Sequence, residues 1–138
     1  MKTFLRFGII LCLALGCGAP MLRAQSVSIS ASPTQITNEG QESTITLTIS
    51  PPAARALAVN LVATGTAGLG SEYVVLGNFN SNQQAVVPAG SSTVTLILHS
   101  LSGGTSNLKE FAVLNVIGGR FYRVGRPSHA QVTIQNVP

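Results

Sequence analysis

The sequence is marked first by residues that are scarce or missing. It contains no aspartate and no tryptophan, and charged residues make up only 9% and aromatic residues only 5% of its 138 positions. Both cysteines, Cys12 and Cys17, fall within the first 24 residues, so the rest of the chain can form neither a disulfide nor a cysteine-ligated zinc site. The shortage of carboxylates argues against a pair of catalytic acids, and the few aromatic rings offer no platform for nucleic-acid bases.

One long hydrophobic run is present, and it lies near the N-terminus. Residues 7–15 are apolar, follow two basic residues and form a stretch too short to span a bilayer comfortably. A polar segment follows, and Ala24 supplies the small residue that signal-peptide cleavage requires. We therefore predict a signal peptide over residues 1–24 and a single domain over residues 25–138.

A second processing site competes with the first. Residues 14–17 (Ala-Leu-Gly-Cys) resemble the box of a bacterial lipoprotein, in which Cys17 is lipidated and becomes the new N-terminus. Cleavage after Ala24 predicts a soluble periplasmic or secreted protein, whereas lipidation at Cys17 predicts a membrane-anchored protein at the bacterial cell surface. Both alternatives place the domain outside the cytoplasm.

Much of the basic character belongs to the predicted leader. The whole chain has a formal charge of +4, but beyond residue 24 five basic residues face four glutamates, which leaves +1. The high isoelectric point therefore does not indicate nucleic-acid binding. Arg120, Arg123 and Arg126 bracket a loop with no acid after Glu110, and they suit an anionic glycan, lipopolysaccharide or acidic protein surface. The alternative is a solvated loop whose arginines keep a sheet edge soluble.

The remainder of the chain has the pattern of a β protein. Apolar residues recur at every second position between clusters of glycine, proline and asparagine, and no stretch has a helical stripe. The segment 111–117 is apolar on both faces, as in a central strand covered on both sides. This spacing predicts an all-β, immunoglobulin-like antiparallel β-sandwich of about seven strands. Six strands are expected around residues 26–30, 44–49, 57–61, 93–99, 111–117 and 131–136.

Several motifs, in order along the chain, go beyond this composition. Residues 36–40 (Ile-Thr-Asn-Glu-Gly) precede a threonine-rich strand, and residues 65–73 read Gly-Thr-Ala-Gly-Leu-Gly-Ser-Glu-Tyr. A Pro-Ala-Gly turn follows at residues 88–90, and residues 122–134 contain Tyr-Arg-Val-Gly-Arg-Pro and a final alternating strand. Together they resemble the Calx-beta domain, a β-sandwich of sodium–calcium exchangers and many bacterial surface proteins. The resemblance implies a non-enzymatic structural or protein-interaction module of the adhesion type.

The same resemblance implies positions for calcium ligands at one end of the sandwich. Three carry acids here, at Glu39, Glu72 and Glu110, whereas other acidic positions of the family fall at Ser100-Leu101 and Gln135-Asn136. Calcium takes six to eight oxygen ligands, several of them carboxylates, so we expect no metal site and no cofactor. Two alternatives remain open: weak calcium binding by these three glutamates, and a carbohydrate-binding sandwich.

Catalytic groups are not evident in the sequence. His99 and His129 both fall on outward strand positions, no carboxylate is expected to orient either ring, and Ser128 points to the face opposite its neighbour. We therefore predict no enzyme and no catalytic residue. Tyr73 and Tyr122 are expected to bury their rings while their hydroxyls bond to the backbone. The expected partner is an unknown protein or an anionic surface, with no nucleic acid, and with a membrane only if Cys17 is lipidated.

Overall fold

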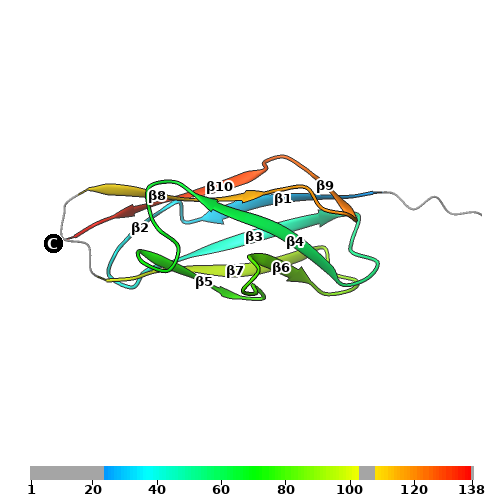
Figure 1. The fold of residues 1–138 in the computed structure, drawn as a ribbon, viewed down its shortest axis with the longest axis horizontal. Coiled ribbons are helices and arrows are strands. Elements are labelled where there is room, and N and C mark those ends of the chain that lie inside the picture. The colour runs from blue at the N-terminus through cyan, green and yellow to red at the C-terminus, as the bar shows by residue number, and fades with distance from the viewer. Residues whose placement is uncertain (1–23, 103–107, 138) are drawn as a thin grey trace, which may run out of the picture.

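The computed structural model describes residues 24–102 and 108–137 as a sandwich of two β-sheets. The sandwich is long and narrow, with its strands running along the longest axis (Figure 1). No helix occurs in these residues, and hence none that could cross a membrane. The predicted leader, including Cys12 and Cys17, lies outside the described residues except for Ala24.

Ten strands form the two sheets. The first sheet has the order β5-β7-β3-β1-β9 and the second the order β2-β10-β8-β4-β6. Neighbours are antiparallel except for β1 with β9 and β10 with β2, which are parallel. The strands are β1 (Gln25–Ser32), β2 (Gln35–Thr37), β3 (Glu42–Ser50), β4 (Leu57–Thr64), β5 (Tyr73–Gly77), β6 (Gln84–Val87), β7 (Thr93–Ser100), β8 (Lys109–Val116), β9 (Tyr122–Val124) and β10 (His129–Gln135).

Both terminal segments cross from one sheet to the other. The N-terminal segment leaves the first sheet after β1 and joins the second as β2, and the break contains Pro33, which has no N–H for a ladder bond. The C-terminal segment makes the same change between β9 and β10, at Pro127. The backbone N–H of Ile29 donates to the carbonyl of Pro127 at 3.0 Å and so ties the two crossing segments together.

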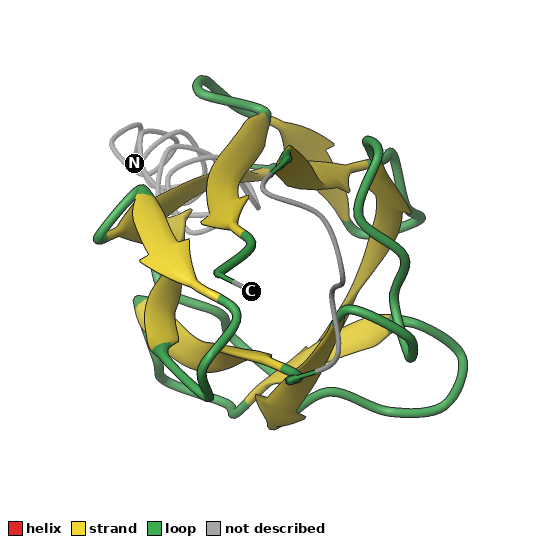
Figure 2. Ribbon diagram, turned by 90° about the vertical axis from the view of Figure 1, so that its left-hand side faces the viewer, coloured by secondary structure: helices red, strands yellow, loops and turns green. Residues whose placement is uncertain are grey.

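The core follows directly from the alternation in the sequence. In β3, Ile45, Leu47 and Ile49 are at most 1% exposed, while the threonines between them face outward. Seen end-on, the two sheets enclose one continuous interior (Figure 2), and the buried side chains of both sheets form a single cluster. Burial of each such aliphatic side chain contributes about 1.5–3 kcal/mol, so the inward stripes supply most of the driving force for this fold.

The predicted class is confirmed, with two differences in detail. All six strands expected from alternation are present, but four more, β2, β5, β6 and β9, were not predicted, because three to five residues are too few to show a period. The expectation that β8 is covered on both faces was wrong: Phe111 is 37% and the adjoining Ile117 43% exposed. Strand β8 is central within its sheet, but the outer face of an antiparallel sandwich meets solvent.

The two ends of the sandwich carry opposite charges. We call one of them the acidic end: it is the end where β3, β5 and β8 begin, on the left of Figure 1. It carries Glu39, Glu42, Glu72 and Glu110. The basic end is the opposite one, where β1, β4 and β9 begin, which carries Arg55, Arg120 and Arg123. Candidate functional groups lie at both.

Candidate functional site

Three glutamates that the sequence assigns to possible calcium positions do lie at the acidic end, but they do not converge. Glu39 is exposed on the turn between β2 and β3, Glu72 lies in the loop before β5, and Glu110 is the second residue of β8. Within residues 24–102 and 108–137, no three histidine, cysteine or acidic side chains gather as a metal would require.

Glu72 is occupied by its own loop. Its Oε2 accepts a hydrogen bond from the Gly68 N–H at 2.6 Å and another from the Ser71 hydroxyl. The hydrogen bond from Ser71, followed by that from Gly68, holds the pKa of this carboxyl below its usual 4.5. A Cβ at Gly68 would lie 2.6 Å from Glu72 Oε2, so any other residue there would displace this carboxylate from its present position.

Buried amides close the rest of the acidic end. Asn136 is 4% exposed, and its Nδ2 donates to Glu110 Oε2 at 3.2 Å. Asn38, also 4% exposed, accepts from the Val137 N–H at 2.8 Å. The Asn136 amide therefore presents an N–H to Glu110 where calcium would need another oxygen. This donor set does not fit calcium.

His99 has a carboxylate partner that the sequence analysis missed. Its Nδ1 lies 3.1 Å from Glu42 Oε1, so the expectation that no carboxylate orients this ring was wrong. The two residues face each other across the β3–β7 ladder, a pairing that depends on register and leaves no local signal. The neighbouring Ser100 hydroxyl is on the inner face and donates to the Thr37 carbonyl at 2.6 Å, so it is not a nucleophile for this pair.

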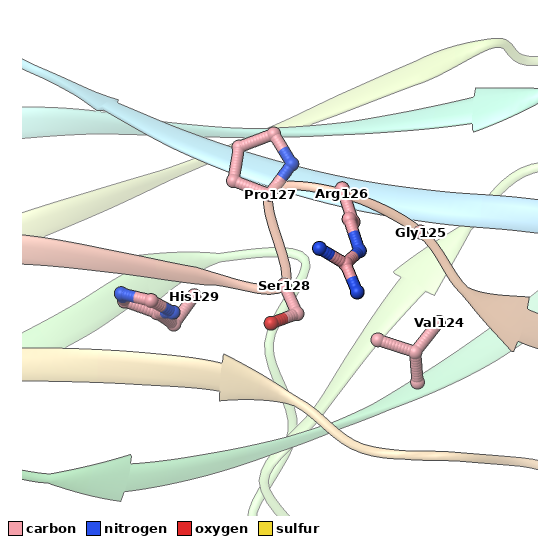
Figure 3. Close-up of a pocket in the computed structure, with 6 residues that line it drawn as sticks. All are labelled: Val124, Gly125, Arg126, Pro127, Ser128 and His129. Carbon is pink, nitrogen blue, oxygen red and sulfur yellow. The ribbon is translucent and has the colours of Figure 1, made fainter.

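The second histidine lies elsewhere on the molecule. His129 is exposed at the start of β10 and lines a hollow of about 400 Å³ with residues 124–128 (Figure 3). Arg126 points into the space between Val124 and Ser128, while the His129 ring lies further along the strand (Figure 3). The arrangement brings no carboxylate to this histidine among the described residues.

At the basic end, a hollow of about 370 Å³ opens between two loops and the start of β1. Phe121 is 61% exposed at this hollow, and the guanidinium of Arg55 lies 5.9 Å from the centre of its ring, within cation–π range. No arginine forms an ion pair with a carboxylate in the described parts of the chain. The lining comprises Ala24, Gln25, Ala54, Arg55, Ala56, Leu57, Arg120, Phe121, Tyr122 and Arg123.

The predicted arginine cluster is thus divided and extended. Arg120 and Arg123 line the basic hollow, whereas Arg126 lines the separate hollow of Figure 3. Arg55 joins the first two from the β3–β4 connection, more than sixty positions earlier in the chain. Long-range contacts, among them the pairing of β9 with β1 and the hydrogen bond between Asn60 and Tyr122, bring the two loops together, so sequence proximity could not have identified Arg55.

A buried tyrosine holds the loop that carries Phe121. The Tyr122 hydroxyl accepts from the Asn60 N–H at 2.9 Å and donates to the Ile117 carbonyl, which confirms the expected backbone partner. Burial is the main reason that its pKa is raised. The same expectation was wrong for Tyr73, whose buried hydroxyl has no hydrogen-bond partner within the described residues and whose pKa burial raises to about 12. The two hydrogen bonds of the Tyr122 hydroxyl therefore hold the loop beside the basic hollow in place.

Comparison with solved structures gives the fold its class. The apo form of the Calx CBD1 domain is similar over 81% of this chain and 98% of its own, with a TM-score of 0.57 and 13% identity. CBD12 from CALX1.2 and the calcium binding domain CBD12 of CALX1.1 each have a TM-score of 0.57 and 15% identity. The similar region comprises 44% of each of these two structures, and it comprises 79% of this chain in the first comparison and 78% in the second.

The chain therefore has a Calx-beta-like fold, as the sequence motifs predicted. At 13–15% identity the similarity concerns the fold alone. Neither a protein-family model nor a curated protein sequence matches the chain.

Proposed function

We propose that this protein is an exported, non-enzymatic interaction module of the adhesion type, which binds an anionic partner through its basic end. One observation carries the proposal: Arg55, Arg120 and Arg123 surround an exposed phenylalanine at an open hollow, without a carboxylate partner in the described residues. Guanidinium groups left unpaired at a concave, partly apolar surface favour a ligand that supplies both carboxylate, sulfate or phosphate groups and an apolar face.

The chemistry of the rest of the molecule supports a binding role over a catalytic one. Beside the carboxylate–histidine pair of Glu42 and His99, the adjoining Ser100 hydroxyl faces inward and is bonded to the Thr37 carbonyl, so it cannot serve this pair as a nucleophile. The similar solved structures are named as CBD domains, one of them as a calcium binding domain. These observations support binding, rather than catalysis, as the activity of this protein.

Export is part of the proposal and has its own test. The predicted cleavage after Ala24 falls at the rim of the basic hollow, which Ala24 and Gln25 line, so removal of the leader would leave a new N-terminus beside the arginines. Mass spectrometry of the protein purified from the extracytoplasmic fraction identifies the first residue. A lipidated Cys17 would place the module on a membrane, and an unmodified Gln25 would make it soluble.

Binding to a sulfated polysaccharide, such as heparin, tests the function itself. We expect the protein to be retained on immobilised heparin, and the combined variant R55A/R120A/R123A to bind about tenfold or more weakly, since each lost charge-assisted contact costs about 0.5 kcal/mol or more. R126A, which removes an arginine outside the hollow, is the matched control. Equal retention of the triple variant, or equal binding to neutral dextran, would contradict the proposal; preference for dextran would favour the carbohydrate-binding alternative.

A further inference from the structure

The charges of the described residues are separated along the long axis of the molecule. All four glutamates lie at the acidic end, accompanied by Lys109, while three arginines lie at the basic end (Figure 1). The only ion pair in the described residues, Glu42 with His99, lies within the acidic end. The negative and positive charges therefore lie at opposite ends of the elongated sandwich and do not neutralise each other.

Each of the two ends also exposes a large apolar side chain. Phe121 is 61% exposed at the basic end, and Leu108, which precedes β8, is 63% exposed at the acidic end. These are the two most exposed large hydrophobic residues described in the structure. An exposed apolar residue at an end that also carries charged side chains is the composition of a small docking surface.

We propose that the basic end of one copy binds the acidic end of a second copy, so that copies associate head to tail. This rests on the proposed function, in which the basic hollow is the binding surface, and it names the anionic partner as another copy of this chain. Such a contact joins two different surfaces of the same protein. It does not close on itself unless a rotation completes a ring, so it builds an open chain.

The acidic end has acceptors available for this contact. Glu39 is exposed, and the hydrogen bonds from Gly68 and Ser71 to Glu72 and from Asn136 to Glu110 all go to Oε2. A carboxylate accepts through both oxygens, so these groups can meet a guanidinium without breaking their internal bonds. The three arginines at the basic hollow provide forked donors of matching geometry.

Other contacts between copies are less favourable. Joining two like ends would bring arginines against arginines or glutamates against glutamates. Along β1 and β3, the outer face of the first sheet presents serine and threonine, and the one charged residue of these two strands is Glu42, at the acidic end. Of the contacts between two ends, the one between unlike ends brings three arginines against four glutamates.

The ends are small, so we expect the contact to be weak and sensitive to salt. The test uses the protein purified after expression with its own leader, and sedimentation over a concentration series. In about 0.01 M salt, where the Debye length is about 30 Å, the weight-average mass should rise continuously, without the plateau of a closed dimer. In about 1 M salt, where that length is about 3 Å, it should return to the monomer.

Charge reversal at each end provides the decisive comparison. R120E/R123E makes both ends acidic, and E39K/E42K makes both ends basic, so each variant alone should stay monomeric. Mixed together they should associate, because unlike ends are again available. R126E changes the same kind of charge away from the basic hollow and should associate like the unchanged protein.

Three results would overturn head-to-tail association: a monomer at every concentration in low salt, a mass that levels off at a dimer, or a mixture that remains monomeric. If the protein is monomeric but heparin retains it through the three arginines, self-association fails and the proposed function stands. If it neither self-associates nor binds heparin, both fail.

Discussion

The two ends of the sandwich treat their charges differently. At the acidic end, three of the four glutamates have partners within the end itself: Glu42 with His99, Glu72 with Gly68 and Ser71, and Glu110 with Asn136. At the basic end, no arginine is paired with an acid among the described residues. The carboxylates that are held at the acidic end have already used part of their acceptor capacity, whereas the guanidinium groups at the basic hollow have no carboxylate partner and gain more from a ligand. The basic end is therefore the better candidate for binding.

The difference extends to the two tyrosines. Tyr122 supports the basic hollow through two hydrogen bonds of its hydroxyl, while Tyr73, at the first position of β5 near the acidic end, has a buried hydroxyl with no partner in the described chain. The hydrogen bonds of Tyr122 thus hold the loop that carries Arg120 and Phe121 in place. A binding surface that is already ordered loses less entropy when a ligand arrives.

The largest effect on stability is expected from adding a side-chain atom beside the Tyr122 ring. A Cβ at Gly119 would lie 2.7 Å from Cζ of Tyr122, and the ring cannot retreat without breaking its two hydrogen bonds. We expect G119A to lower the free energy of unfolding by about 3 kcal/mol, measured by urea denaturation followed by circular dichroism. Gly118 has no atom within 4 Å of the added Cβ, so G118A should change stability by less than about 1 kcal/mol. Similar free energies of unfolding for G119A and G118A would show that the Tyr122 ring is not held rigidly.

The next effect compares the tyrosines directly. Y122F leaves the Asn60 N–H and the Ile117 carbonyl without their partner and should cost about 2 kcal/mol. Y73F removes a hydroxyl that is buried without a hydrogen bond, so it should leave stability unchanged or raise it by up to about 1 kcal/mol. Urea denaturation of both variants under one condition tests this, and a Y73F loss as large as that of Y122F would contradict it.

These contrasts also mark how far the sequence could be interpreted. Alternation predicted β3 with its inward Ile45, Leu47 and Ile49, because a two-residue period is a local property of the chain. It could not predict β9, since three residues carry no period and this strand forms only by pairing with β1. Secondary structure held by distant pairing leaves little trace in its own residues.

The candidate site was predicted in part for the same reason. Arg120, Arg123 and Arg126 were identified together because they are close in sequence, but Arg126 lines a different hollow from the other two. Arg55 and the Glu42–His99 pair were missed because loop docking and strand register create them. Short-range motifs predicted the fold, but the site depends on long-range packing.

A smaller effect concerns acid stability. Hydrogen bonds from Ser71 and Gly68 lower the pKa of Glu72 from 4.5 in the folded protein, so its contribution is fully present above about pH 4.5 and is lost as pH falls through the folded pKa. We expect E72Q to be less stable than the unchanged protein at neutral pH, by less than about 1 kcal/mol because the group is accessible to solvent. The difference should shrink in urea denaturations at acidic pH. S71A should show part of the same loss, and a difference that does not change with pH would contradict this role.

The smallest effect is expected from calcium, and it sharpens the contrast between the ends. A ligand that binds the folded state raises the midpoint of thermal unfolding according to its affinity and concentration. Because Asn136 presents an N–H to Glu110, and Glu72 is engaged by its loop, millimolar calcium should shift the midpoint no more than the same concentration of magnesium. N136D, which offers an oxygen in place of the amide N–H, is the matched variant, and it should gain a calcium-dependent shift if this amide is what closes the end. A calcium-specific rise in the unchanged protein would show instead that its three glutamates still form a metal site.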